Sequence, residues 1–223
     1  MCYNCAMKTN GGRSVLVTGG TVRLGAAIAD GLRARGWRVI VSSHRKGTGA
    51  DIVADLSEPS GPARLYAAAL SLAPDLCAIV NNAGLFRGDA ATLESVNLVA
   101  PRKLTTLLAG REGIVGSVVN ILDSRTLAPQ PSVGDTPYEA TKRALQAETM
   151  RSAALFAQTL RVNAVAPGPI LPPEGEEHVL AGEMLLDARP TKEDVADAVA
   201  YLLDARSVTG VVIPVDSGQH LVS

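Results

Sequence analysis

The segment Ser14–Gly25 constrains the fold of this chain most strongly. An apolar, β-branched run ends abruptly in Thr18-Gly19-Gly20, and a helical pattern begins within a few residues. We interpret the segment as a strand, a tight turn and a helix, whose first N–H groups are left unpaired at the positive end of the helix dipole and suit a phosphate. The spacing is Thr-Gly-x-x-x-x-x-Gly, with Arg23, and not G-x-G-x-x-G. An ordinary glycine turn of an α/β protein is therefore the alternative.

Strands and helices alternate along nearly the whole chain after this turn. The patterns predict further strands at 38–42, 51–54, 76–80, 116–122, 161–166 and 211–215, and helices at 26–35, 61–73, 92–108, 137–158 and from a cap at Thr191 to Leu203. Several strands are apolar on both faces, which indicates a parallel sheet covered by helices on both sides. The predicted fold is α/β, a doubly wound, Rossmann-type parallel sheet in a single domain at 13–223, preceded by a flexible arm at 1–12.

Composition excludes several classes of function. Lys and Arg number 21 against 22 Asp and Glu, so a nucleic-acid footprint is not indicated. No apolar run reaches the ~18 residues of a membrane span, and the first twelve residues lack a signal-peptide core. Cys2-x-x-Cys5 has the spacing of metal ligands, but no second Cys or His pair completes a site, so we expect no metal. These features favour a cytoplasmic protein without nucleic-acid or membrane partners.

Polar and glycine residues follow the predicted strands at their carboxyl ends, which meet at one edge of such a sheet. They are Thr18-Gly19, His44-Arg45, Asp55-Leu56, Asn81-Asn82-Ala83-Gly84, Asp123 and Pro167-Gly168. Ligands bind at this edge in doubly wound folds.

Tyr138 and Lys142 lie four residues apart in the long helix predicted at 137–158, hence on one face of it. A nearby ammonium favours the ionised form of a phenol, so the pair can give a proton to a carbonyl or imine while hydride arrives from elsewhere. An unrelated surface Tyr and Lys is the alternative.

Taken together, these residues resemble the short-chain dehydrogenases/reductases, and the resemblance covers residues 14–221. It rests on Thr18-Gly19…Gly25, Asp55, Asn81-Asn82-Ala83-Gly84, Asn97, Tyr138-x-x-x-Lys142, Pro167-Gly168, Val208-Thr209-Gly210 and Val215-Asp216. The resemblance implies that Tyr138 is the catalytic acid, that Lys142 lowers its pKa and holds the nicotinamide ribose, and that Asn97 supports a water-linked proton path. A solvent-facing Asn97 is the alternative.

The resemblance also implies the cofactor contacts. Asp55 and Leu56 would lie at the adenine end, and Asn82, Ala83 and Gly84 along the cofactor. The other implied contacts are Thr18, Gly19, Arg23, Leu24, Gly25, Pro167 and Gly168.

One departure from the family pattern concerns the substrate. The family usually has a serine shortly after Asn120, and here Asp123 takes its place. A carboxylate accepts hydrogen bonds and suits the N–H groups of a nitrogen heterocycle. Ser124 is offset by one residue, which on a strand would turn it to the other face. Asp123 could instead pair only with Arg125.

Three further features refine the expected ligands. Arg23 replaces a glycine and places a cation beside the pyrophosphate and the mouth of the site. His44-Arg45-Lys46 ends a strand without an acid, which favours the 2′-phosphate of NADPH over NAD. Phe86 follows Asn-Asn-Ala-Gly closely and could stack on a flat substrate, ordinary loop packing being the alternative.

With Asp123, these features resemble the pteridine reductase branch, including dihydromonapterin reductases, and imply NADPH-dependent reduction of a pterin held by Arg23, Phe86, Asp123 and Tyr138. The alternatives are a carbonyl reductase of the same family and a cofactor-sensing protein without turnover. Small residues at Ala140, Ala144 and Ala147 permit close helix packing, and the family resemblance implies a homotetramer. The acidic, proline-bearing segment at 171–189 is shorter than the family's usual lid.

Overall fold

The computed structural model describes residues 13–127, 135–170 and 182–222. Seven parallel strands form one sheet in the order β3-β2-β1-β4-β5-β6-β7. They are β1 (Ser14–Val17), β2 (Arg38–Ser43), β3 (Ile52–Val53), β4 (Leu76–Asn81), β5 (Gly116–Ile121), β6 (Leu160–Pro167) and β7 (Val212–Val215). The strand order reverses between β1 and β4, which is where ligands bind in doubly wound sheets.

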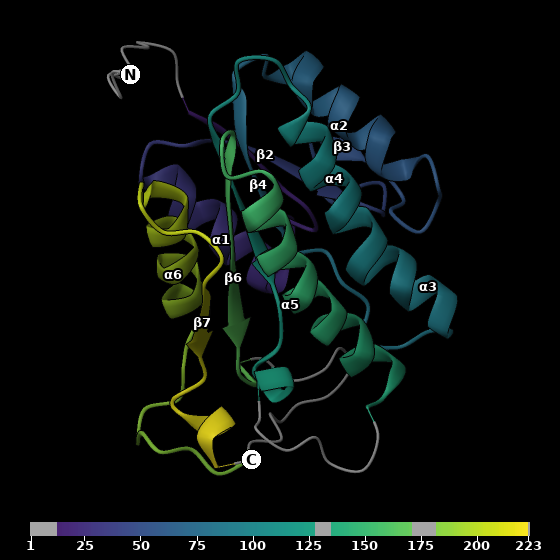
Figure 1. Cartoon of the computed structure of the whole chain (residues 1–223). Coiled ribbons are helices and arrows are strands. Elements are labelled where there is room, and N and C mark those ends of the chain that lie inside the picture. The colour runs from purple at the N-terminus through teal and green to yellow at the C-terminus, as the bar shows by residue number, and fades with distance from the viewer. Residues whose placement is uncertain (1–12, 128–134, 171–181, 223) are drawn as a thin grey trace.

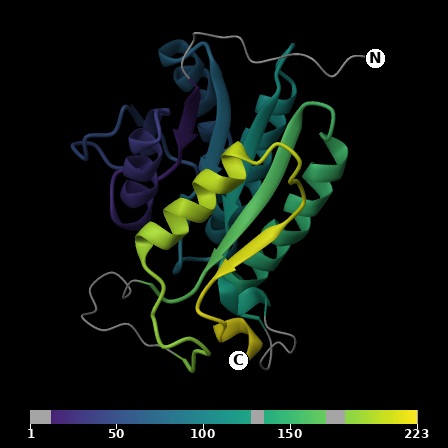
Figure 2. The same ribbon diagram turned by 90° about the vertical axis from the view of Figure 1, so that its left-hand side faces the viewer.

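Helices cover both faces of the sheet (Figures 1 and 2). Helices α1 (Arg23–Ala34) and α6 (Lys192–Asp204) cover one face, and α2 (Gly61–Leu72), α4 (Ala100–Ala109) and α5 (Pro137–Leu155) cover the other. The short helix α3 (Ala90–Glu94) precedes α4. In Figure 1 the arrows of β6 and β7 run toward the lower edge, where the carboxyl ends of the strands lie.

Two apolar cores hold the helices against the sheet. Ile28 and Leu32 of α1 pack with Val195 and Val199 of α6, and all four side chains are fully buried. On the other face, Leu65 and Leu104 pack against Ile79 of β4. Each such side chain contributes roughly 1.5–3 kcal/mol relative to an exposed one, so the two cores fix the strand edge that carries the site.

The predicted single-domain doubly wound fold is confirmed, and so are the helix starts that the sequence marks most clearly. Pro137 is the first residue of α5, after a capping box of Thr136 and Glu139. Thr191 and Asp194 form the same motif on α6.

Differences lie mainly at element boundaries. The strand predicted at 51–54 is only Ile52–Val53, and β5 ends at Ile121 because a 3₁₀ turn (Ser124–Leu127) follows. Helix α5 ends at Leu155, short of the predicted residue 158. The helix predicted at 92–108 begins earlier, at Ala90, where the Asp89 side chain caps it, and it contains a π-helical turn (Ser95–Val99).

No helix in the described part of the chain is long and apolar enough to cross a membrane. Among the same residues, no group of three or more His, Cys, Asp or Glu side chains could hold a metal. The Cys2/Cys5 pair and the arm at 1–12 lie outside the described residues.

Candidate active site

The turn after β1 is tied to the end of β4 by Thr18 and Asn82. The Thr18 hydroxyl accepts hydrogen bonds from the backbone N–H groups of Asn82 (3.0 Å) and Ala83 (2.9 Å). The Asn82 amide donates to the carbonyl oxygens of Thr18 (2.9 Å) and Gly19 (3.1 Å). The two strand ends at the topological switch point therefore form one rigid unit.

Glycine is required at two positions of this turn. Gly19 has φ +62°, a backbone conformation that side chains rarely allow. A Cβ on Gly25 would lie 2.0 Å from the Gly19 carbonyl oxygen and 2.6 Å from Nδ2 of Asn82. Leu24 packs against the core that α1 shares with α6.

The N-terminus of α1 fits a pyrophosphate. Its cap residue Val22 makes no side-chain hydrogen bond, and no acidic residue lies in its first turn. Helices α5 and α6, in contrast, have capping boxes with acidic residues in the first turn. Arg23, the first residue of α1, has φ +53°, which explains why a glycine is common at this position. The N–H groups of the first helical turn and the Arg23 cation together favour an anion here.

The far end of this edge is basic. His44 and Arg45 are exposed after β2, and Arg45 Nε lies 3.1 Å from His44 Nε2. Asp55, after β3, is exposed and accepts from the backbone N–H (2.8 Å) and hydroxyl (2.7 Å) of Ser57, which hold the pKa of its carboxyl below the usual range. Leu56 is buried in the core of α2. In the sheet, β2 and β3 are separated by β1 and β4 from β5, the strand that leads to Asp123.

Asn97 is fully buried in the π-helical turn, which excludes a solvent-facing role. Its amide accepts from the Leu85 backbone N–H (2.8 Å) and donates to the Leu85 carbonyl oxygen (2.9 Å) and the Thr141 hydroxyl (3.1 Å). The wide turn, a feature common at functional sites, aims Asn97 at the loop that precedes Phe86. The predicted water-linked proton path is not tested by these contacts.

Gly84 joins this loop to Lys142. A Cβ on Gly84 would lie 3.3 Å from Oδ1 of Asn97 and 3.5 Å from Nζ of Lys142. The loop after β4, the π turn and helix α5 therefore meet at one point.

Tyr138 and Asp123 are in direct contact. The Tyr138 hydroxyl donates to Asp123 Oδ2 (2.9 Å), although β5 ends before Asp123. Ser124 does not replace Asp123: its hydroxyl is buried and has no partner among the described residues. Strand alternation is not the reason, because Ser124 already belongs to the 3₁₀ turn.

Arg125 also binds Asp123. Its Nε and Nη2 donate to Oδ1 (3.1 Å) and Oδ2 (2.9 Å), and its backbone N–H donates to Oδ1 (3.0 Å). Burial alone would raise the pKa of the Asp123 carboxyl, but these bonds outweigh it and hold that pKa below the usual value. The ion pair and the contact with Tyr138 are thus both present, and Asp123 is a carboxylate at neutral pH.

Phe86 completes this cluster. Its ring packs edge-to-face on Tyr138, with centroids 4.9 Å apart, and the residue is 49% exposed. The Arg125 guanidinium lies over the Phe86 ring at 5.5 Å and the Tyr138 ring at 5.7 Å. An exposed aromatic beside a proton donor offers a surface for a flat ligand.

The expected lowering of the Tyr138 pKa is wrong. Burial and then the Asp123 carboxylate raise the pKa of the phenol well above its usual range. Lys142 Nζ lies 5.9 Å from the Tyr138 ring centroid and donates to the Ile121 carbonyl oxygen (2.8 Å). Burial lowers the pKa of this ammonium to about 8.

The sequence reasoning missed a buried polar chain beneath the site. The Asn81 amide donates to Asn120 Oδ1 (2.8 Å), and the Asn120 amide donates to Thr149 Oγ1 (2.9 Å). Asn81 and Asn120 are register partners at the ends of β4 and β5. Two asparagines ending neighbouring apolar strands are a signal that could have revealed this link. The sequence also did not predict that Thr141, three residues after Tyr138, accepts a hydrogen bond from Asn97, because no motif marks this pair.

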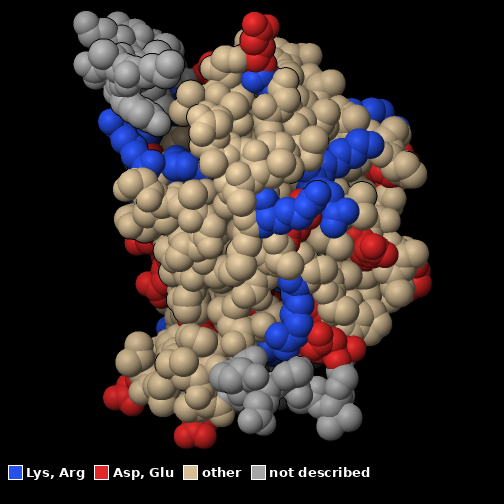
Figure 3. All heavy atoms as spheres, viewed as in Figure 1, with Lys and Arg blue, Asp and Glu red and all other residues tan. Residues whose placement is uncertain are grey.

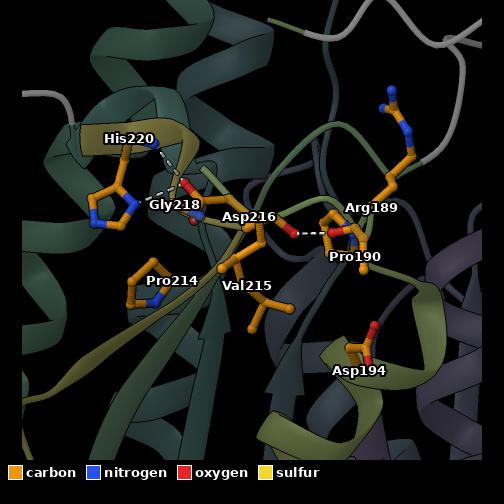
Figure 4. A pocket seen from close by; sticks show the side chains of 11 residues that line it. Arg189, Pro190, Asp194, Pro214, Val215, Asp216, Gly218 and His220 are labelled. Atoms are coloured by element: carbon orange, nitrogen blue, oxygen red, sulfur yellow. Dashed lines mark hydrogen bonds and ion pairs between the residues drawn. The ribbon is translucent and has the colours of Figure 1, made fainter. Parts of the chain in front are cut away.

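A separate pocket of about 410 Å³ lies at the end of β7 (Figure 4). The buried Asp216 carboxylate accepts there from the Gly218 N–H (3.1 Å) and the His220 N–H (2.8 Å), and it lies 2.8 Å from His220 Nδ1. Pro167-Gly168 adjoins it, since a Cβ on Gly168 would lie 2.8 Å from Asp216 Cβ. The pocket contains neither Tyr138 nor Asp123, and the segment at 171–181 lies outside the described residues.

Comparison with known proteins identifies the family. The family model described as short chain dehydrogenase matches residues 13–179. The chain belongs to the short-chain dehydrogenase family. It is therefore an oxidoreductase of a family that uses nicotinamide cofactors, and the uncapped α1 N-terminus and the glycine turn fit such a cofactor.

Relatives of two substrate classes are similar to it. A putative ketoacyl reductase 2 of the granaticin polyketide synthase from Streptomyces violaceoruber is 32% identical, over 93% of this chain and 96% of the relative. Pteridine reductase 1 from Leishmania tarentolae is 30% identical, over 92% of this chain and 96% of the relative. Among solved structures, FolM Alternative dihydrofolate reductase 1 from Brucella suis in complex with NADP has a TM-score of 0.81 and 31% identity, covering 94% of this chain and 95% of that one.

Proposed function

We propose that this protein is an NADPH-dependent reductase of a pterin ring, converting a dihydropterin to a tetrahydropterin. The observation that carries the proposal is the contact of Tyr138 with Asp123 at 2.9 Å, beside the exposed Phe86 ring. A carboxylate at the usual serine position suits a substrate that presents N–H groups rather than a lone carbonyl oxygen. Similarity to pteridine reductase 1 and to FolM Alternative dihydrofolate reductase 1 supports this substrate class.

When bound, NADPH would supply a hydride to the carbon of a ring C=N bond. Tyr138 would give its proton to the ring nitrogen, so that the C=N bond becomes CH–NH and the phenolate is left behind. Lys142 would stabilise that phenolate, and Asp123 would orient the phenol and accept a hydrogen bond from a ring N–H group. Asn97, through its bonds to Leu85, would hold the loop that presents Phe86.

For the cofactor, we propose NADPH rather than NADH. His44, Arg45 and Lys46 follow β2 without an acid that would bind a ribose 2′-hydroxyl. The arginine guanidinium suits a 2′-phosphate. Arg23 at the start of α1 would contact the pyrophosphate and the edge of the pterin, and a preference for NADPH in steady-state assays tests the assignment.

For the assembly, we propose a homotetramer built through α4 and α5. The side chains on one side of α5 are small, at Ala140, Ala144 and Ala147, and would allow a second helix to approach closely. The apolar residues Met150 and Val99 are 49% and 42% exposed. Figure 3 views the molecule from the side on which α4 and α5 lie, where uncharged residues (tan) surround several Lys and Arg side chains. Such a face can pack against a second copy, and sedimentation analysis showing a monomer would contradict the assignment.

The second candidate is an NADPH-dependent carbonyl reductase, favoured by the 32% identity to a ketoacyl reductase. Asp123→Ser separates the two functions, and Ser124→Ala, which changes a hydroxyl at the next position, is the matched control. We expect Asp123→Ser to lower dihydropterin turnover by at least tenfold and Ser124→Ala to leave it within about threefold. Wild-type turnover of ketones alone would favour the second candidate.

A further inference from the structure

Arg125 covers both surfaces that the proposed function assigns to the substrate. Its guanidinium binds both oxygens of Asp123, at 3.1 and 2.9 Å, and lies 5.5 Å above the Phe86 ring. A pterin stacked on Phe86 with an N–H on Asp123 would need the same space. This inference therefore rests on the proposed pterin reduction.

The chemistry of the two occupants is similar. A guanidinium is flat and presents neighbouring N–H groups in a fork that matches a carboxylate. The 2-amino-pyrimidine part of a pterin is also flat and also carries neighbouring N–H donors. Arg125 thus makes, within the chain, the kinds of contact that this class of ligand would make.

We propose that Arg125 is a built-in competitor of the substrate, which a flat heterocycle with N–H donors displaces when it binds. The Arg125 side chain is 45% exposed, so it can withdraw into solvent. Its side chain donates to both oxygens of Asp123 and also interacts with the Tyr138 hydroxyl. The bond from the Arg125 backbone N–H to Oδ1 (3.0 Å) does not depend on the side chain, and it keeps the carboxylate oriented after the guanidinium leaves.

The contact between Arg125 and Asp123 also affects the binding of ligands that lack N–H donors. A simple ketone has no N–H donor, so displacing Arg125 would leave Asp123 with only the Tyr138 hydroxyl and one backbone N–H. Leaving a half-buried carboxylate with fewer partners is unfavourable. Ligands without such donors would therefore enter weakly while Arg125 is in place.

The test measures binding of 7,8-dihydrobiopterin to the NADP⁺-saturated enzyme by isothermal titration calorimetry. Arg125→Ala should lower the Kd by about 5- to 30-fold, because a partly exposed ion pair and two cation–π contacts no longer oppose binding. KM for the dihydropterin should fall with it, while kcat stays within about fivefold. Arg125→Lys keeps the charge but loses the forked N–H groups of the guanidinium. Its Kd should lie between those of the wild type and Arg125→Ala.

Arg35→Ala is the matched control. Arg35 is 40% exposed and pairs with Asp197 at 2.6 Å, joining α1 to α6 on the other face of the sheet. This variant should leave the Kd unchanged. Loss of a merely structural arginine would weaken binding, so tighter binding supports the proposal.

The failures are distinguishable. If the wild type turns over the dihydropterin and Arg125→Ala binds it equally well or more weakly, Arg125 is not a competitor although the proposed function stands. If the wild type neither binds nor reduces the dihydropterin, the proposed function fails and this inference fails with it.

Discussion

Replacing Asp123 with asparagine should lower the pKa of Tyr138. The carboxylate oxygen lies 2.9 Å from the phenol oxygen, and both residues are partly buried. Two unit charges about 4 Å apart interact by about 4 kcal/mol at an effective dielectric constant of 20. That energy corresponds to about 3 pH units in the pKa of Tyr138. Arg125, no longer neutralised, would act in the same direction, and we expect the pKa of Tyr138 to fall by about 2 to 3 in Asp123→Asn.

Ultraviolet absorbance of tyrosinate measures this change without any substrate. The chain has four tyrosines, so each titration is compared with its Tyr138→Phe counterpart, which isolates Tyr138. The tyrosinate step of Asp123→Asn should lie at lower pH than that of the wild type, and it should vanish in Asp123→Asn/Tyr138→Phe. Identical wild-type and Asp123→Asn titrations would refute the conclusion that Asp123 controls the phenol.

The remaining variants test the two ends of the site. Lys142→Met should abolish turnover yet raise the free energy of unfolding at pH 7 by about 1–2 kcal/mol. The pKa of the buried ammonium is about 8 in the folded protein against the usual 10.5, so burying the charged form destabilises the fold by about 3 kcal/mol. The hydrogen bond from Lys142 to the Ile121 carbonyl oxygen offsets part of this cost. Because the unfolded chain binds the proton more tightly, that gain should shrink as pH rises from 8 toward 10.5, and urea unfolding that shows no gain at pH 7 would contradict it. Gly25→Ala should weaken NADPH binding at least tenfold in fluorescence titrations, since its Cβ would meet the Gly19 carbonyl oxygen. Gly31→Ala on the same helix is the control: its Cβ would lie 3.2 Å from Ala196 Cβ and 3.5 Å from Arg35 Nη1, away from the turn, and this variant should bind NADPH normally.

The fold could be predicted because its determinants are local and repeated. The apolar runs of β1, β4, β5 and β6 are each bounded by polar or glycine residues, and Pro137 and Thr191 mark helix starts. The two-residue strand β3 and the end of β5 were placed less well, since a strand ends where its neighbours and the following turn dictate. No local pattern distinguishes the π-helical turn around Asn97 from an ordinary helix.

The site could be predicted by residue but not by charge state. The sequence placed Tyr138, Lys142 and Asp123 at one sheet edge, and the structure brings Tyr138 and Asp123 into contact. The direction that the sequence predicted for the Tyr138 pKa was wrong, because that pKa depends on burial and on whether the carboxylate or the ammonium lies nearer. Arg125 was considered only as a partner of Asp123, because its position over Phe86 depends on the fold of the 3₁₀ turn and the loop after β4 together.

The ratio of kcat/KM for 7,8-dihydrobiopterin to that for a simple ketone, measured with NADPH and the wild-type enzyme, tests the proposed function most directly. A carboxylate in place of the serine hydroxyl donor predicts a ratio of at least about 100 in favour of the pterin. A ratio below one, with ketone turnover intact, would contradict the assignment and make the protein a carbonyl reductase.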